Sequence, residues 1–328
     1  MLASRITSAP RPAIIAAALV LLHGAPAWAA PSRVWVANFG ADSAQCGSIA
    51  APCLGFQQAH DNVAAGGDIS VLTPVEFASV LSISKAVSVT NDGVGDASIS
   101  NGVPVQVIAG AGDVVGLRGL VLDGHGFGGE VGLLIMQASA VHVQNCVIRN
   151  FESRVNGFGV VLFPSGNTRL FVSDTIVYNN GNIAGSGGIL ITKIQGGSGS
   201  VVLDRVHLEN NVVGVFVDGS SGTGNGFHVV IRDSVVSGNA SDGILAKSAD
   251  GKAPAFVVVE RTSAVNNGGV GVHADGPHAT ILLNDNTITR NGTGISAGNG
   301  GQLISYGNNR NNNNVGPEGV PTGLFSLM

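Results

Sequence analysis

Three titratable residues near the C-terminal end of the sequence could carry out acid–base chemistry. His273, Asp275 and His278 fall in one short stretch, and a histidine beside a carboxylate can accept and return a proton near neutral pH. The same stretch joins two expected strands, so a loop is required there whether or not it has a function. If the chain is catalytic, these residues are the first candidates.

A second candidate is the sequence Asp123-Gly124-His125-Gly126, which also brings a carboxylate close to an imidazole. Glycine-rich turns produce such triplets readily. The pattern therefore needs partner residues on neighbouring elements before it indicates a catalytic site.

Charged residues form two columns in which the sign alternates from one repeat to the next. The columns are Asp204, Arg232 and Glu260, followed by Asn284, and next to them Arg205, Asp233, Arg261 and Asp285. Each charge thus has an opposite charge above or below it, which favours a ladder of ion pairs. Catalytic carboxylates and calcium ligands instead require like charges crowded together. We interpret the two columns as structural.

A repeat positions these residues. Val201–Asn211 reads as a strand, a polar corner, a short second strand and an asparagine, and near-copies of it recur along the chain. The recurring asparagines are Asn180, Asn211, Asn239, Asn267, Asn291 and Asn313. Such spacing is typical of stacked-repeat proteins, and apolar residues alternating at period two predict strands. Three short strands per repeat leave no room for a crossover helix, so parallel strands are expected to wind directly on one another.

We expect the asparagine column to be structural. Asparagine tolerates left-handed dihedrals at a tight corner, and its amide can bond the backbone of its own and the next turn. Stacked turns lie about 4.8 Å apart, so the amides can also bond one another along the column. A row that binds sugar is the alternative for these residues.

The order of strand, variable loop, strand, polar corner, strand and asparagine corner resembles the right-handed parallel β-helix of the pectate-lyase-like superfamily. The resemblance covers roughly residues 69–315. It implies an all-β fold, a single-stranded right-handed parallel β-helix with three strands per coil. It also implies that a polysaccharide would lie along the sheet of first strands, so a polysaccharide cleft is the alternative for the charged columns. One fold hosts many functions, so the activity has to be argued from the site.

The catalytic motifs of the related enzymes are incomplete in this sequence. The Gly124-His125-Gly126 triplet is similar to the Gly-His-Gly of polygalacturonases, which also carry Asp-Asp on a neighbouring turn, and this sequence contains no Asp-Asp. The Asp275–His278 stretch is similar to the Asp-Pro-His of alginate epimerases, with an inserted glycine and no following aspartate. The glycine pairs lack the aspartates of calcium-binding repeats. We expect no metal and no cofactor.

Composition and charge limit the classes of partner. The 328 residues include 49 glycines, and only 11% are charged, as in a tightly turned β protein. A net charge of −5 offers no basic patch for nucleic acid. No stretch is long enough to span a membrane. A basic start, an apolar run and an Ala-x-Ala ending predict a signal peptide over residues 1–29, cleaved after Ala29, and a secreted or periplasmic protein.

An exported chain favours a disulfide between Cys46 and Cys53, whereas Cys146 falls in an inward column and is expected to be a small core residue. Apolar residues at helical spacing over Cys53–Ala65 predict a helix that covers the open end of the coil. The expected organisation is a cap over 30–68, a β-helix over 69–315 and a C-terminal tail over 316–328 that folds back on it.

Two apolar columns are expected to point outward. One comprises Phe171, Val202, Val230, Val258, Leu282 and Ile304, and the other Leu134, Val161, Leu190, Phe216 and Leu245. Rows of this length are more than a monomer usually leaves in water. Either neighbouring loops and the apolar C-terminal tail cover them, which we favour, or two or three copies associate side by side.

The favoured function is an exported, non-catalytic scaffold that binds a polysaccharide or another component of the cell envelope. Charges that compensate one another, few aromatic residues and incomplete catalytic motifs support it. The alternative is a polysaccharide-active enzyme, a lyase, hydrolase or epimerase, acting in a groove on the first sheet.

Overall fold

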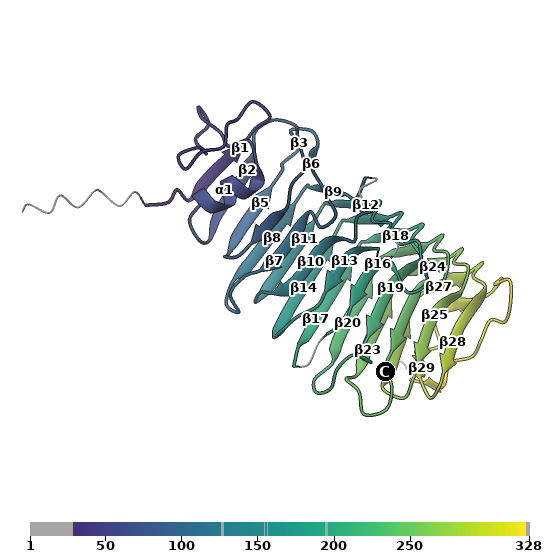
Figure 1. Ribbon diagram of the computed structural model, residues 1–328. Coiled ribbons are helices and arrows are strands. Elements are labelled where there is room, and N and C mark those ends of the chain that lie inside the picture. The colour runs from purple at the N-terminus through teal and green to yellow at the C-terminus, as the bar shows by residue number, and fades with distance from the viewer. Residues whose placement is uncertain (1–28, 126–127, 154, 156, 194–195, 326–328) are drawn as a thin grey trace, which may run out of the picture.

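The computed structural model describes residues 29–125, 128–153, 155, 157–193 and 196–325. Within them the chain winds into a right-handed parallel β-helix, which confirms the fold predicted from the repeat. Each complete turn adds one strand to each of three parallel sheets, and the turns stack along one axis (Figure 1). Residues 1–28 of the expected signal peptide lie outside the described residues.

The first sheet contains the strands that follow the variable loops. Its 12 strands are, in order along the axis, β1 (Arg33–Val36), β2 (Gly67–Val71), β5 (Val87–Thr90), β8 (Val114–Arg118), β11 (Ala140–Gln144), β14 (Asn167–Ser173), β17 (Ser198–Asp204), β20 (Phe227–Arg232), β23 (Ala255–Glu260), β26 (Ala279–Asn284), β29 (Gln302–Ser305) and β31 (Gly323–Leu324).

The second and third sheets complete each turn. The second contains β3 (Val75–Phe77), β6 (Ala97–Ser100), β9 (Val121–Asp123), β12 (Val147–Arg149), β15 (Ile176–Tyr178), β18 (His207–Glu209), β21 (Val235–Ser237), β24 (Ser263–Val265), β27 (Thr287–Thr289) and β30 (Arg310–Asn311). The third contains β4 (Leu81–Ile83), β7 (Val105–Ile108), β10 (Val131–Gln137), β13 (Phe158–Leu162), β16 (Gly187–Ile191), β19 (Val213–Asp218), β22 (Ile244–Lys247), β25 (Val270–Asp275) and β28 (Thr293–Gly298).

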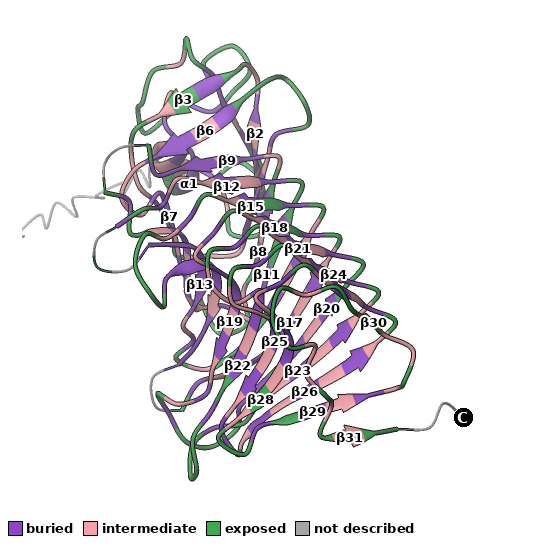
Figure 2. Cartoon of the chain, turned by 90° about the vertical axis from the view of Figure 1, so that its right-hand side faces the viewer, coloured by how far each residue is buried: buried purple, intermediate pink, exposed green. Residues whose placement is uncertain are grey.

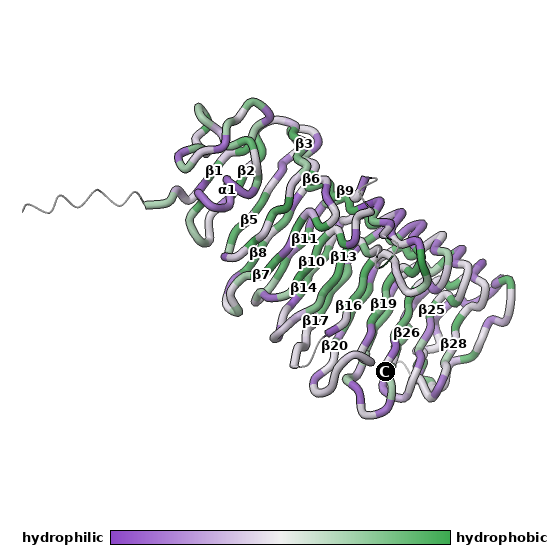
Figure 3. Tube along the Cα trace, viewed as in Figure 1, coloured by the Kyte–Doolittle hydropathy of each residue, from purple (hydrophilic) through white to green (hydrophobic). Residues whose placement is uncertain are grey.

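The core is a set of aliphatic rows inside the coil. Val201 of β17 lies beside Val229 of β20, which lies beside Val257 of β23, and all three are at most 1% exposed. Burial alternates along the first-sheet strands β17, β20 and β23, and purple segments recur from turn to turn in Figure 2. Apolar residues recur in the same way, as the green segments of the strands in Figure 3 show. Each fully buried aliphatic side chain contributes about 1.5–3 kcal/mol, so the rows hold neighbouring turns together.

The N-terminal end is covered by the helix α1 (Phe56–Asn62) and by the disulfide loop. Two side chains of α1, Gln57 and His60, accept the backbone N–H groups of Ser82, on the edge strand β4, and of Ser84, just after that strand. The backbone of Trp35 bonds Gly47 O and Cys53 N beside the Cys46–Cys53 disulfide. Edge strands left open invite pairing with other chains, and these contacts close that end. The first sheet thus begins at β1, inside the region predicted to be only a cap.

The C-terminal tail extends the first sheet and does not fold over its outward face. In β31, Gly323 and Leu324 lie in register with Ile304 and Ser305 of β29. Leu324 is 72% exposed, so the described part of the tail does not cover the outward apolar columns. Those columns are half-buried because stacked turns are about 4.8 Å apart and each side chain shields its neighbours in the row. Side-by-side association remains a prediction.

Buried asparagine amides stack along one corner of the coil. Asn180 Nδ2 donates to Asn211 Oδ1 at 2.9 Å, and Asn239 Nδ2 donates to Asn267 Oδ1 at 2.8 Å. Each ladder asparagine also accepts the backbone N–H of its counterpart one turn earlier, as Asn239 Oδ1 does from Asn211 at 3.0 Å. The left-handed dihedrals occur one residue earlier, for example at Asn210 with φ 54°.

The last position of the ladder is Asn314 and not the predicted Asn313. Asn291 Nδ2 donates to Asn314 Oδ1 at 3.0 Å. Asn313 has φ 60° and takes the left-handed position that Arg290, with φ 58°, takes one turn earlier. A run of four asparagines, Asn311–Asn314, hides this one-residue shift in the sequence.

A second ladder of small polar side chains at the opposite end of the second-sheet strands was not predicted. Thr175, Ser234, Thr262, Asn286 and Asn309 each accept a backbone N–H from the preceding turn through a side-chain oxygen. The inward column that contains Cys146 is therefore largely a hydrogen-bonding column. Both corners of the second sheet are thus fixed by buried polar side chains.

Candidate functional site

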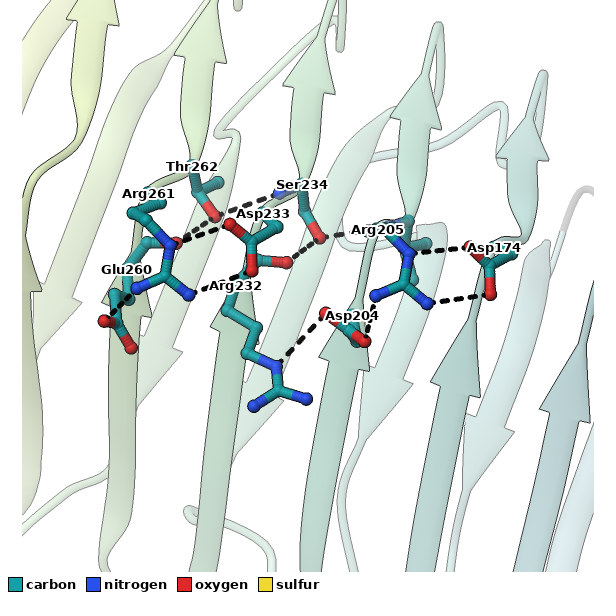
Figure 4. Close-up of polar contacts among 10 residues, drawn as sticks. Asp174, Asp204, Arg205, Arg232, Asp233, Ser234, Glu260, Arg261 and Thr262 are labelled. Atoms are coloured by element: carbon teal, nitrogen blue, oxygen red, sulfur yellow. Dashed lines mark hydrogen bonds and ion pairs between the residues drawn. The ribbon is translucent and has the colours of Figure 1, made fainter.

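The outward corner of the first sheet carries a ladder of ion pairs in two groups, one around Arg205 and the other around Arg261 (Figure 4). Arg205 binds both oxygens of Asp174, at 2.7 and 3.0 Å, and Arg261 binds both oxygens of Asp233, at 2.8 and 2.9 Å. All four residues have φ between 44° and 52°, which turns their side chains toward the neighbouring turn. Asp174 was missed in the sequence, although it lies one repeat before Arg205 in the same column.

Strand residues beside this corner extend both groups of ion pairs. Asp204 binds Arg205 at 2.6 Å and Arg232 at 3.1 Å, and Glu260 contacts Arg261 and accepts from Asn284 Nδ2 at 3.3 Å. Asp285 instead donates its backbone N–H to Asn308 Oδ1, and no ion pair to it occurs within the described residues.

The corner arginines hold the carboxylates of Asp174 and Asp233 in their ionised form. Hydrogen bonds from Arg205 and from Arg261 lower the pKa of Asp174 and Asp233, respectively, below the ordinary range. A general acid needs the opposite shift, toward neutral pH. A calcium ion would need oxygens that these arginines already hold. The arrangement can stabilise the corner, but it offers neither a proton donor nor a cation cage.

The three sequence candidates His273, Asp275 and His278 have separate partners. His273 Nδ1 lies 2.8 Å from Asp242 Oδ2, Asp275 accepts from Asn299 Nδ2 at 2.6 Å, and His278 Nδ1 lies 2.8 Å from Lys252 O. The hydrogen bond from Asn299 and the nearby Lys247 lower the pKa of Asp275. His273 and Asp275 share the outward face of β25, whereas His278 lies in the following loop.

Asp123 and His125 lie together at the edge of a cavity of about 410 Å³, lined by His125, Gly128, Gly129, Asn150 and Glu152. The buried Asp123 accepts from Arg149 Nε at 2.7 Å and from Asn150 Nδ2 at 2.9 Å, and His125 Nδ1 lies 3.2 Å away. Burial favours a higher pKa for Asp123, but the hydrogen bonds from Asn150, Arg149 and His125 hold it below its ordinary value. This carboxylate is an anchor for the corner and not a proton donor.

A groove near the N-terminal end of the first sheet was not found in the sequence. It encloses about 290 Å³ and is lined by Arg33, Trp35, Asp68, Ser70, Val71, Thr90, Asp92 and Val94. Trp35 starts an outward row that continues through Ser70 and Thr90 to Arg118. Two ion pairs, Arg33–Asp68 and Arg118–Asp92, lie at 3.3 Å beside the row. The groove thus presents a half-buried indole next to hydroxyl and charged groups.

The cysteines have structural roles. Cys46 and Cys53 are joined in a disulfide, so they do not act as metal ligands with the nearby Asp42, whose Oδ1 accepts the N–H groups of Leu54 and Gly55. Burial raises the pKa of the Cys146 thiol to about 11. Within the described part of the chain, no helix is long and apolar enough to cross a membrane.

No protein-family model matches the sequence, and no curated protein matches it. Among solved structures, the chain is similar to pectate lyase Pel9A at 15% identity and a TM-score of 0.55, over 91% of this chain and 82% of that one. It is also similar to the GH136 lacto-N-biosidase from Eubacterium ramulus at 13% identity and a TM-score of 0.41, over 90% of this chain and 68% of that one. The similarity to pectate lyase Pel9A shows the fold alone.

Proposed function

We propose that this chain is an exported, non-catalytic β-helix that binds a polysaccharide on the outward face of its first sheet. The observation that carries the proposal is the groove at Trp35, where an indole adjoins the hydroxyls of Ser70 and Thr90 and the carboxylates of Asp68 and Asp92. An aromatic face packs against the C–H groups of a sugar ring, and neighbouring polar groups bond its hydroxyls. The groove opens on a parallel sheet, along which an extended chain can lie.

The ion pairs in the groove indicate the kind of polysaccharide. Arg33 is paired with Asp68, and Arg118 with Asp92, so the charges of the groove balance. A strongly acidic chain would have to compete with Asp68 and Asp92 for the two arginines. We therefore propose a neutral or weakly charged polysaccharide, whose binding depends little on salt.

The ladder of ion pairs supports binding over catalysis on this face. Arginine partners lower the pKa of Asp174 and of Asp233, whereas glycoside hydrolysis needs a carboxyl group that is protonated near neutral pH. The Cys46–Cys53 disulfide is compatible with an extracellular or periplasmic location. Pectate lyase Pel9A shares the fold, and its name connects one such β-helix with a polysaccharide.

Affinity electrophoresis in gels containing neutral or uronate polysaccharides tests the proposal. Migration should be retarded by a neutral polysaccharide, and Trp35→Ala should remove at least about 90% of the retardation because it removes the aromatic face. Phe39→Ala is the matched control, since Phe39 is 63% exposed and does not line the groove. Equal retardation of the wild type and the Trp35 variant would overturn the assignment of the groove.

The alternative, a polysaccharide-active enzyme, is checked on the same panel by following new reducing ends and unsaturated products, with and without calcium. We expect neither. Their appearance would overturn the non-catalytic proposal, and variants at His125 and Glu152 would then be tested first, because these residues line the cavity next to Asp123.

A further inference from the structure

One ring nitrogen of His273 is fixed by a carboxylate, and the other is turned away from it. His273 Nδ1 lies 2.8 Å from Asp242 Oδ2, and Asp242 Oδ1 accepts the backbone N–H of Val270 at 2.8 Å. The histidine side chain is 23% exposed and that of Asp242 is 14% exposed. Because Nδ1 is occupied, Nε2 is the nitrogen that can bind a ligand.

Gly298 keeps the space beside this nitrogen open. A Cβ atom on Gly298 would stand 3.5 Å from His273 Nε2 and 3.4 Å from Asp275 Oδ1. The two atoms therefore face one small volume above β28, where Gly298 lies in register with Asp275. The φ of Gly298 is not in the left-handed region, so the backbone does not require a glycine here.

We propose that His273 Nε2 and Asp275 Oδ1 bind a divalent transition-metal ion, such as Zn²⁺ or Cu²⁺, in the space above Gly298. An imidazole nitrogen together with a carboxylate oxygen suits these metals. Asp242 holds the ring in the way that outer carboxylates hold metal-binding histidines. The bonds from His273 Nε2 and Asp275 Oδ1 to the ion would be about 2.0–2.2 Å long, and water completes the coordination.

The neighbours of the site set the strength of binding. Asp275 Oδ1 accepts from Asn299 Nδ2 at 2.6 Å, and Asp275 Oδ2 lies 3.5 Å from Lys247 Nζ. The positive charge of Lys247 opposes a cation, so two protein ligands beside a lysine indicate a site of moderate affinity. This site lies on the third sheet toward the C-terminal end and goes beyond polysaccharide binding at Trp35. Either proposal can fail without the other.

Calorimetric titration of the full chain with Zn²⁺, in a buffer that does not bind metal, measures the site directly. Gly298→Ala is the decisive variant, because its added methyl group lies within 3.5 Å of both ligand atoms, in the space that they face, and changes no charge. We expect one site per chain, weakened at least about tenfold by Gly298→Ala and by Asp275→Asn. Lys247→Gln should strengthen binding about threefold or more, since it removes the opposing charge.

His207→Ala is the matched control, because His207 Nδ1 also lies beside a carboxylate, Glu209 Oε1, at 3.0 Å. It should leave the Zn²⁺ affinity unchanged. Circular dichroism checks that each variant is folded. If Asp275→Asn does not fold, the Gly298→Ala variant decides the result. A wild type that binds no Zn²⁺ below 1 mM (roughly the weakest affinity of a specific site), or a Gly298→Ala variant that binds it as the wild type does, overturns the proposal.

Discussion

Replacing Asn239 by alanine tests whether the asparagine ladder holds the coil together. The Asn239 side chain is buried and takes part in three hydrogen bonds: it accepts Asn211 N–H at 3.0 Å, and its Nδ2 donates to Leu208 O at 3.3 Å and to Asn267 Oδ1 at 2.8 Å. The substitution leaves the buried N–H of Asn211 without its acceptor, at a cost of about 1–3 kcal/mol. The other two bonds contribute about 1 kcal/mol each, so the free energy of unfolding should fall by about 3–5 kcal/mol.

Urea unfolding followed by far-ultraviolet circular dichroism measures this change as a lower midpoint. Since each turn of a solenoid contacts only its neighbours, the variant should also unfold less cooperatively, with the turns on either side of residue 239 separating. Asn266→Gly is the control: Asn266 is exposed with φ 58°, which glycine adopts without strain, and the expected change is within about 0.5 kcal/mol. A loss of less than about 1 kcal/mol for Asn239→Ala would refute the view that the stacked amides stabilise the corner.

Four further outcomes follow from buried groups and from the tail. Because the pKa of Asp123 is lowered in the folded chain, its contribution to stability is complete above about pH 4 and is lost as the pH falls through the folded pKa. The melting temperature of Asp123→Asn should therefore fall less steeply than that of the wild type as the pH is lowered below about 4. The Cys146 thiol, with its pKa raised to about 11, should react with a disulfide reagent about 100-fold more slowly in the native than in the unfolded chain. Lys193 is buried and donates to backbone carbonyls of the loop Gly219–Gly226, so Lys193→Met should accelerate limited proteolysis in that loop about tenfold. Deleting residues 321–328 removes β31 and opens the edge of β29, so dye binding and light scattering should increase.

The fold was predictable because each repeat solves the same physical problem. A buried corner needs a side-chain acceptor for its backbone N–H groups, and the recurring asparagines of the sequence indicate where these corners lie. The strands follow from the period-two alternation between the corners. The prediction was wrong by one residue where several neighbouring asparagines could fill the ladder position. In the Asn311–Asn314 run, the backbone dihedrals and hydrogen bonds distinguish Asn313 from Asn314, and the sequence does not.

The contacts that define the sites were less predictable because they join residues far apart in the chain. Asp242 approaches His273 across one full turn, and Trp35 lies in register with Ser70 across the whole disulfide cap. The early turns are irregular in length, so no repeat spacing aligns Trp35 with Ser70. Asp174 could have been found by extending the charged corner column back by one repeat. The exposed C-terminal tail lacked any such signal, because its apolar residues suggest cover where the structure has an added strand.

The position of the two proposed sites follows from the regularity of the coil. Inside the long outward rows each side chain meets an equivalent side chain one turn away, and opposite charges such as Asp233 and Arg261 neutralise each other. The polar groups of a regular row therefore already have partners within the row, and few of them are free to bind a ligand. A side chain at either end of a row lacks a neighbour on one side and can contact a ligand there. Trp35 is the first member of its row, and Gly298 is the last of the row that contains Lys247 and Asp275. If binding instead maps to the centre of the ion-pair ladder, this link between regularity and inertness is wrong.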